Sequence, residues 1–154
     1  MQCGFQAKDV IGLTNLSYRQ IDYWVRNKFI IPRTIQKGSR RIRIFSFDNL
    51  VVIRAAMKLL DFGLGFPVVK KAATWLQEAF ESGAKGDFLF VANGDNLTFL
   101  CSDTDEILQL MRGKCAIIID LGQIISQLEN DIEVLRQRNI SSQRSYTIPD
   151  FSIA

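Results

Sequence analysis

The chain of 154 residues contains no histidine and only three cysteines. Without histidine, Ser-His and Cys-His nucleophile chemistry is excluded, and the side chain that most often binds metals is absent. Cys3, Cys101 and Cys115 are odd in number and widely spaced, which argues against a disulfide framework and against a zinc site of the CxxC type. We expect no metal and no cofactor. The cysteines are predicted to be small hydrophobic residues, with a thiol sensor as the alternative.

Long apolar runs are also lacking. No stretch of about 18 apolar residues is present, and no basic segment followed by a long hydrophobic one begins the chain. We therefore expect no membrane span, no secretory signal and a cytoplasmic protein. Apolar residues make up 47% of the chain and charged residues 23%, as in globular proteins, so a packed core is expected.

Charge is unevenly distributed along the chain. Residues 1–85 carry 14 basic and 6 acidic side chains, whereas residues 86–154 carry 5 and 10. Residues 17–45 contain eight basic side chains and a single acid, Asp22. Such a cluster is typical of a surface that binds a polyanion, and we favour nucleic acid over a solvated basic face without function.

The hydrophobic pattern of the first part predicts four helices and a hairpin. A short helix over 7–13 is followed by a turn at Asn15, and Ser17 is a plausible N-cap of a second helix. Residues 34–45 alternate in the manner of strands around a Lys37-Gly38-Ser39 turn, which indicates a basic wing. Ser46 is expected to cap a third helix that ends at Phe62-Gly63, and Phe66-Pro67 to open a fourth.

A second unit is predicted after a linker at residues 83–86. Residues 87–92 and 97–101 are expected to be strands joined by Asn93-Gly94-Asp95-Asn96, followed by a short helix capped by Ser102 or Asp103 and a strand over 115–119. Residues 121–138 are predicted to be a long helix with a dimerisation seam at heptad spacing, made of Leu121, Ile125, Leu128, Ile132 and Leu135. The alternative is a helix packed on the sheet of its own domain.

These motifs resemble the MerR family of bacterial transcription regulators over about residues 5–77. Residues 13–21 (LTNLSYRQI) look like the turn and the start of the family's recognition helix, and residues 41–46 (RIRIFS) look like its wing-to-helix motif. Residues 47–50 (FDNL) and 60–64 (LDFGL) complete the match in the same order. In the recognition helix the family usually has an arginine and two tyrosines where this chain has Asp22, Tyr23 and Trp24. Asp22 is expected to pair with Arg19 or Arg26, or to accept from a cytosine amino group.

The resemblance implies a mainly α fold with small β sheets (α+β). It implies a winged helix-turn-helix over 1–82. The small α/β unit with a C-terminal helix over 87–138 departs from the family, and the polar residues 139–154 are predicted to be a disordered tail. The resemblance further implies a homodimer that binds a pseudo-palindromic operator in double-stranded DNA, with RNA polymerase as a possible partner. The residues predicted to contact DNA are Ser17, Tyr18, Arg19, Gln20, Tyr23, Arg26, Lys37, Arg40, Arg41 and Arg43.

The sequence has two alternative interpretations. In the first, an antitoxin-like protein uses its acidic C-terminal unit to bind a protein partner, and DNA binding serves autoregulation. The second is an enzyme, which is not expected, because Asp103, Asp105 and Glu106 are explained more simply as the acidic first turn of a helix.

Overall fold

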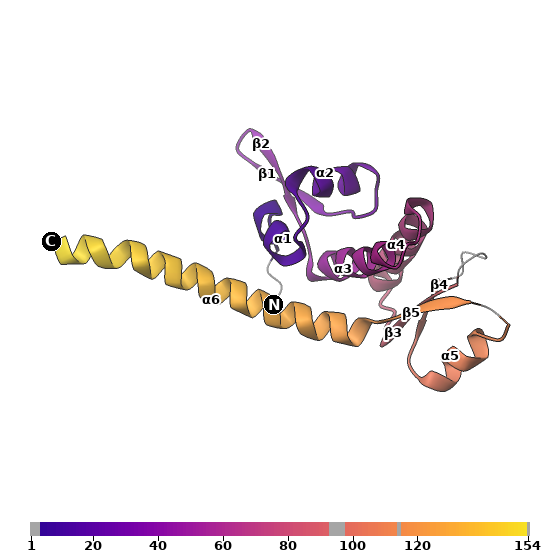
Figure 1. The fold of residues 1–154 in the computed structure, drawn as a ribbon. Helices are drawn as coiled ribbons and strands as arrows, with labels where there is room; N and C mark the ends of the chain where they lie inside the picture. Colours follow the sequence, from indigo (N-terminus) through magenta and orange to yellow (C-terminus); the bar gives the residue numbers. More distant parts are fainter. Residues whose placement is uncertain (1–3, 93–97, 114, 154) are drawn as a thin grey trace.

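The computed structural model describes residues 4–92, 98–113 and 115–153. Its N-terminal part contains four helices and one hairpin in the predicted order (Figure 1). These elements are α1 (Ala7–Thr14), α2 (Tyr18–Arg26), β1 (Arg33–Lys37), β2 (Arg40–Ile44), α3 (Phe47–Asp61) and α4 (Phe66–Glu81). The hairpin stands out from the helices as the predicted wing.

The turn between α1 and α2 has the predicted chemistry. Asn15 adopts the left-handed conformation at φ 62°, a backbone region that asparagine tolerates better than most residues. Ser17 then caps α2, because its hydroxyl oxygen accepts from the backbone amide of Gln20. The two helices are thereby joined by a tight turn.

The end of α2 was not apparent from the sequence. Lys28 also has a positive φ, 61°, and the amide of Phe29 donates to the carbonyl of Trp24 at 2.9 Å, which is the hydrogen-bond pattern of a Schellman motif. The rings of Trp24 and Phe29 stack with centroids 5.5 Å apart. This aromatic contact fixes the direction in which the chain leaves α2, at the cost of a lysine in an unfavourable backbone region.

The second part of the chain forms a three-stranded antiparallel sheet of order β4-β3-β5. Its elements are β3 (Phe88–Ala92), β4 (Thr98–Cys101), α5 (Thr104–Leu110) and β5 (Ala116–Asp120). Asp103, rather than Ser102, caps α5. The predicted turn at residues 93–96 lies outside the described residues. Phe90 and Cys101 on one side of the sheet pack with Ile107 of α5.

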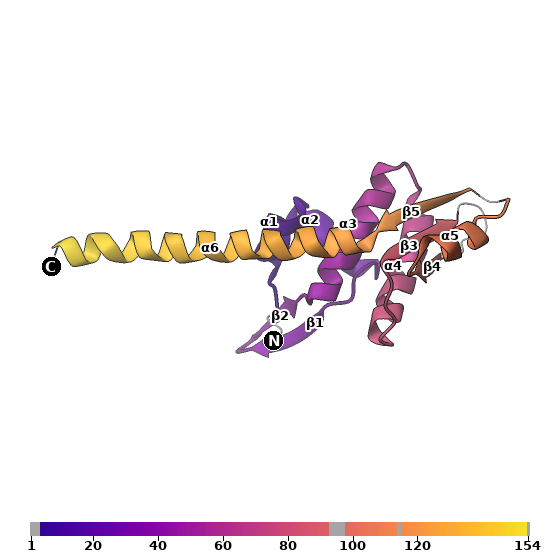
Figure 2. The ribbon, with the colours of Figure 1, turned by 90° about the horizontal axis from the view of Figure 1, so that it is seen from below.

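The other side of this sheet shares a core with the N-terminal helices. Leu89, Val91 and Ile119 belong to the same buried cluster as α1, α3 and α4. Helix α6 (Leu121–Ile153) leaves β5 directly and runs along α3 and α1 (Figure 2). The two predicted units are therefore in contact through one hydrophobic core.

Helix α6 is longer than the predicted 121–138 and extends to Ile153. Residues 139–153, for which a disordered tail is predicted, lie within the bounds of this helix. Extending an existing helix costs less than starting a new one, since each added residue contributes its own hydrogen bond. No helix among the described residues is both long and apolar enough to span a bilayer.

Candidate nucleic-acid interface

The exposed side of α2 presents the side chains that were predicted to contact DNA. Ile21 and Trp24 are buried, whereas Tyr18 is 60% and Tyr23 51% exposed. Arg19 and Arg26 are exposed on the same helix. This division follows from the helical period, which leaves two guanidinium and two phenol groups toward solvent.

Two of the predicted contact residues have a structural role. The hydroxyl of Ser17 accepts from the amide of Gln20 at 3.1 Å, and the side-chain oxygen of Gln20 accepts from the amide of Ser17 at 2.9 Å. This reciprocal capping box occupies the oxygen acceptor of each side chain. Ser17 and Gln20 thus fix the start of α2, and they lie next to the exposed Tyr18 and Arg19.

Asp22 joins α2 to the wing. Its two carboxylate oxygens lie 2.9 Å from Nε of Arg26 and 2.9 Å from Nη1 of Arg43. The pairing with Arg26 was one of the expected outcomes, whereas the pairing with Arg43 depends on the tertiary structure. The acid therefore positions two cations, one from α2 and one from β2, on a common surface.

The wing, residues 33–44, has two basic sides. Lys37 lies opposite Arg40, and Gln36 opposite Arg41, in the antiparallel register. Because side chains alternate along a strand, Arg41 projects to the same side of the wing as Arg43, whereas Lys37 and Arg40 project to the other. Like charges directly opposite each other destabilise a hairpin, and a bound polyanion relieves that repulsion. Lys37, Arg40 and Arg41 are all exposed.

An aromatic contact holds Tyr23 at the edge of this surface. Its ring meets the ring of Phe66, the first residue of α4, edge to face with centroids 5.9 Å apart. Phe66 in turn contacts Phe29 at 5.0 Å. The contact restricts the rotation of the Tyr23 ring while its side chain stays half exposed, so the hydroxyl is presented to solvent from a fixed position.

Comparisons with known proteins agree with this geometry. Residues 5–74 match the family model described as MerR HTH family regulatory protein. Residues 5–74, the MerR-type unit, are therefore similar to this family. The resemblance predicted from the motifs is thereby confirmed.

Relatives of the chain bear the names of regulators of the same general type. Uncharacterized HTH-type transcriptional regulators of Mycobacterium bovis and Mycobacterium tuberculosis are each 24% identical to it over 111 residues, which is 71% of this chain and 48% of the relative. The chain therefore spans about half the length of these curated relatives.

The residues predicted to form a dimerisation seam lie against the MerR-type unit of their own chain. Leu121 and Leu128 are fully buried, and Ile132 is 7% exposed. Ile125 and Leu135 are partly buried against the same core. In this structure α6 packs within its own chain, as in the alternative prediction, but mainly on helices α1 and α3 rather than on the sheet.

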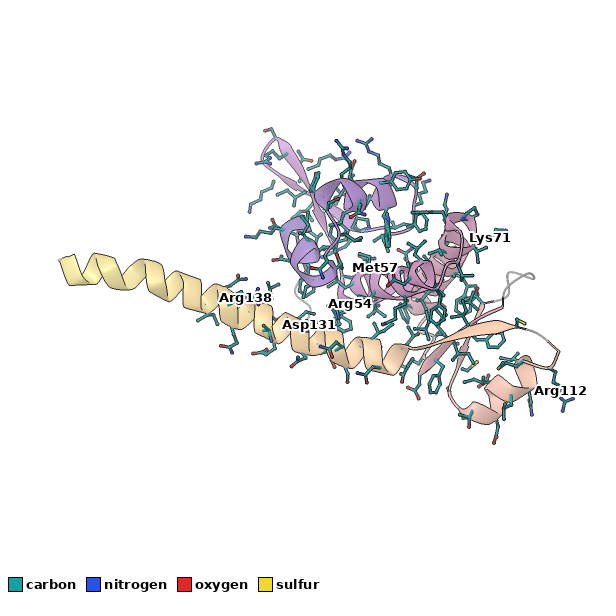
Figure 3. All side chains as sticks on the ribbon, viewed as in Figure 1. Arg54, Met57, Lys71, Arg112, Asp131 and Arg138 are labelled. Atoms are coloured by element: carbon teal, nitrogen blue, oxygen red, sulfur yellow. The ribbon has the colours of Figure 1, made fainter. Side chains whose placement is uncertain are left out.

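One polar contact at this junction was not found from the sequence. Arg54 of α3 donates to the carbonyl of Leu13 through Nε at 3.2 Å and Nη2 at 2.7 Å, and Nη2 also lies 2.7 Å from the carboxylate of Asp131 on α6 (Figure 3). The hydrogen bond from Arg54 lowers the pKa of Asp131, although partial burial opposes the shift. The only signal in the sequence was a single arginine among the apolar residues 50–57.

The described residues provide no evident metal site. No group of three or more His, Cys, Asp or Glu side chains in the described ranges could hold an ion. Cys101 is buried and Cys115 exposed, while Cys3 lies outside the described residues. Burial, followed by the charges of Glu106 and Asp103, raises the pKa of the Cys101 thiol.

Proposed function

We propose that the chain is a transcription regulator that binds a pseudo-palindromic DNA operator as a homodimer. In this proposal α2 enters the major groove and the wing contacts flanking phosphates. The observation that supports it best is the cationic surface in which Asp22 joins Arg26 of α2 to Arg43 of the wing. A surface with cations from two elements can neutralise several phosphates of one duplex.

The residues on this surface have different proposed roles. Tyr18 and Arg19 stand at the exposed start of α2, the part of a recognition helix that contacts base edges. Lys37, Arg40 and Arg41 are exposed on the wing and form no ion pair with another described residue, so they are free to contact phosphates. Tyr23, Arg26 and Arg43 are held by neighbouring side chains, and they are proposed to position the sugar-phosphate backbone of the DNA.

The dimer is proposed to form through the distal part of α6. Beyond Arg138 this helix extends past α1 in both ribbon views, whereas its first part packs against the core of its own chain (Figures 1 and 2). A helix of 33 residues spans about 50 Å, enough to reach a second copy. Sedimentation of a chain ending at Arg138 tests this: a monomer is expected, and a dimer of unchanged affinity would place the interface elsewhere.

The DNA-binding proposal is tested with purified protein and fragmented genomic DNA at near-physiological salt, followed by sequencing of the retained fragments. Enrichment of an inverted repeat is the expected result. Retention without a common motif, lost steeply as salt rises, would contradict a sequence-specific operator.

Two variants separate base contacts from phosphate contacts. Arg41→Ala should weaken binding to all sequences and reduce the slope of log K against log salt by about one. Arg19→Ala should instead reduce the preference for the operator, by about 1 to 3 kcal/mol if a bidentate base contact is lost. Arg112→Ala removes the same charge at the far end of the molecule and serves as the control (Figure 3). Equal behaviour of the first two variants would refute the assignment of roles.

A further inference from the structure

A cavity lies where the MerR-type unit meets the C-terminal unit. It has a volume of about 670 Å³ and is lined by the end of α1, by α3, by β5 and by the first turns of α6. This volume is within the range of about 300–1,000 Å³ that is common for small-molecule sites. Its apolar lining includes Met57 of α3, Phe62 directly after α3, and Ile124 of α6.

Part of this apolar lining is open to water. Phe62 is 73% exposed, although it is a large hydrophobic side chain. It does not lie on the surface proposed to bind DNA. An occupant with an apolar body would remove this surface from water, which is favourable by about 25 cal/mol for each Å² covered.

Two carboxylates on the cavity lining already have hydrogen-bond donors within the protein. The carboxylate of Asp120 accepts from the amide of Gln123 at 2.9 Å, and that of Asp131 accepts from Arg54 and from Gln127. Asp120 also lies at the N-terminus of α6, where the helix dipole favours a negative charge.

The two basic side chains on the lining differ, because Arg54 is already bound by the Leu13 carbonyl and by Asp131. Lys58 lies one turn after Arg54 on α3, lines the same cavity and forms no ion pair with another described residue. Asp61 is a third carboxylate on the lining, and Asp61 and Lys58 are both exposed. The cation that remains for a ligand is therefore Lys58, with the guanidinium of Arg54 beside it.

We propose that this cavity binds a small amphipathic carboxylate. Its carboxylate lies at Lys58 and Arg54, and its apolar part lies along Met57, Phe62 and Ile124. A single negative charge fits better than several, because Asp61 lies close to Lys58 on the same helix and would repel a second one.

Occupancy of the cavity is coupled to the helix-turn-helix through Arg54. The guanidinium joins Asp131 of α6 to the carbonyl of Leu13, two residues before the left-handed Asn15 that turns the chain into α2. A ligand carboxylate competes with Asp131 for this guanidinium and changes the support of the turn. This second step rests on the proposed DNA-binding function, and by linkage DNA must change ligand affinity by the same factor.

Decanoate below its micellar concentration is a suitable probe, with decanol and decyltrimethylammonium as the neutral and cationic counterparts. Calorimetry on the full chain should show saturable binding of one decanoate per chain. The Lys58→Gln variant should weaken decanoate binding about five- to tenfold, the loss of one charge-assisted contact, and leave decanol binding unchanged. The Lys70→Gln variant removes an exposed lysine of α4 that does not line the cavity, and it should bind decanoate as the wild type does.

Either of two results would overturn the site: decyltrimethylammonium binding as tightly as decanoate, or equal decanoate affinity in the two lysine variants. The coupling is measured separately, as the affinity for the enriched DNA with and without saturating decanoate, and a change of at least about threefold is expected. Unchanged DNA affinity at saturation refutes the coupling alone. Failure to bind DNA in either state refutes the proposed function, and the calorimetric result on the cavity still stands.

Discussion

Replacement of Leu128 by alanine tests whether α6 belongs to the core of its own chain. Leu128 is fully buried in the cluster that joins α6 to the N-terminal helices. Removing a buried leucine side chain in this way costs about 2–5 kcal/mol, because apolar contacts are lost and a cavity remains. For a chain of this length, a loss of about 3 kcal/mol lowers Tm by roughly 6–12 °C.

The assay combines thermal unfolding, followed by circular dichroism, with sedimentation over a hundredfold range of concentration. Val134, 46% exposed on the same helix, supplies the control. Its replacement by alanine should change stability by less than about 0.5 kcal/mol. If Leu128 packs within its own chain, Leu128→Ala lowers Tm without changing the dimer dissociation constant. A weakened dimer with unchanged Tm would show that Leu128 faces a second copy, and the reasoning would be refuted.

Three further predictions concern single side chains. Asp22→Asn should raise the affinity for random DNA, because a negative charge is removed from the cationic surface. It should also lower the ratio of operator binding to random binding about three- to tenfold, because the wing loses its fixed orientation. Competition binding measures both quantities. Asp131→Asn should lower stability by about 1–2 kcal/mol at pH 7, a value reduced for the partial exposure of the ion pair with Arg54. The pKa of Asp131 is lowered in the folded state, so the stability difference between wild type and variant should be present above about pH 4 and disappear as the pH falls through the folded pKa. Denaturant titrations at several pH values measure this difference. In a Cys3→Ser background, the exposed Cys115 should react rapidly with a thiol reagent. Cys101 is buried and its pKa is raised, so it should react only when the protein unfolds. Rapid reaction of both thiols would contradict the burial of Cys101.

Much of the N-terminal unit follows from local sequence. Ser17 and Ser46 cap α2 and α3 because a hydroxyl accepts the otherwise unpaired amide three residues on. Gly63, with φ 92°, ends α3 because glycine adopts a positive φ without a steric penalty. These interactions span only a few residues, so composition and spacing are enough to predict them. The cationic cluster was also predictable, because charge is a property of each residue.

Contacts between distant residues could not be predicted in the same way. The sequence shows that Asp22 needs a cationic partner, but the choice of Arg43 depends on how the wing lies beside α2. Phe66 supports Tyr23 only because α4 begins next to α2. Sequence spacing contains no information about such pairs, since they are brought together by the packing of separate elements.

Helix α6 shows the same division most clearly. The apolar spacing of Leu121, Leu128 and their neighbours predicted a dimerisation seam on one side of the helix, and Leu121 and Leu128 are buried in the structure. Whether that side meets a second chain or its own was decided by the tertiary structure, because any apolar surface of suitable shape satisfies the hydrophobic effect. Helix α6 follows strand β5 directly and lies beside α3, and the ion pair between Arg54 and Asp131 forms where α3 and α6 meet. The sequence by itself determined the helices, their caps and the charge of the cationic surface, whereas the residues that each surface contacts were decided by the fold.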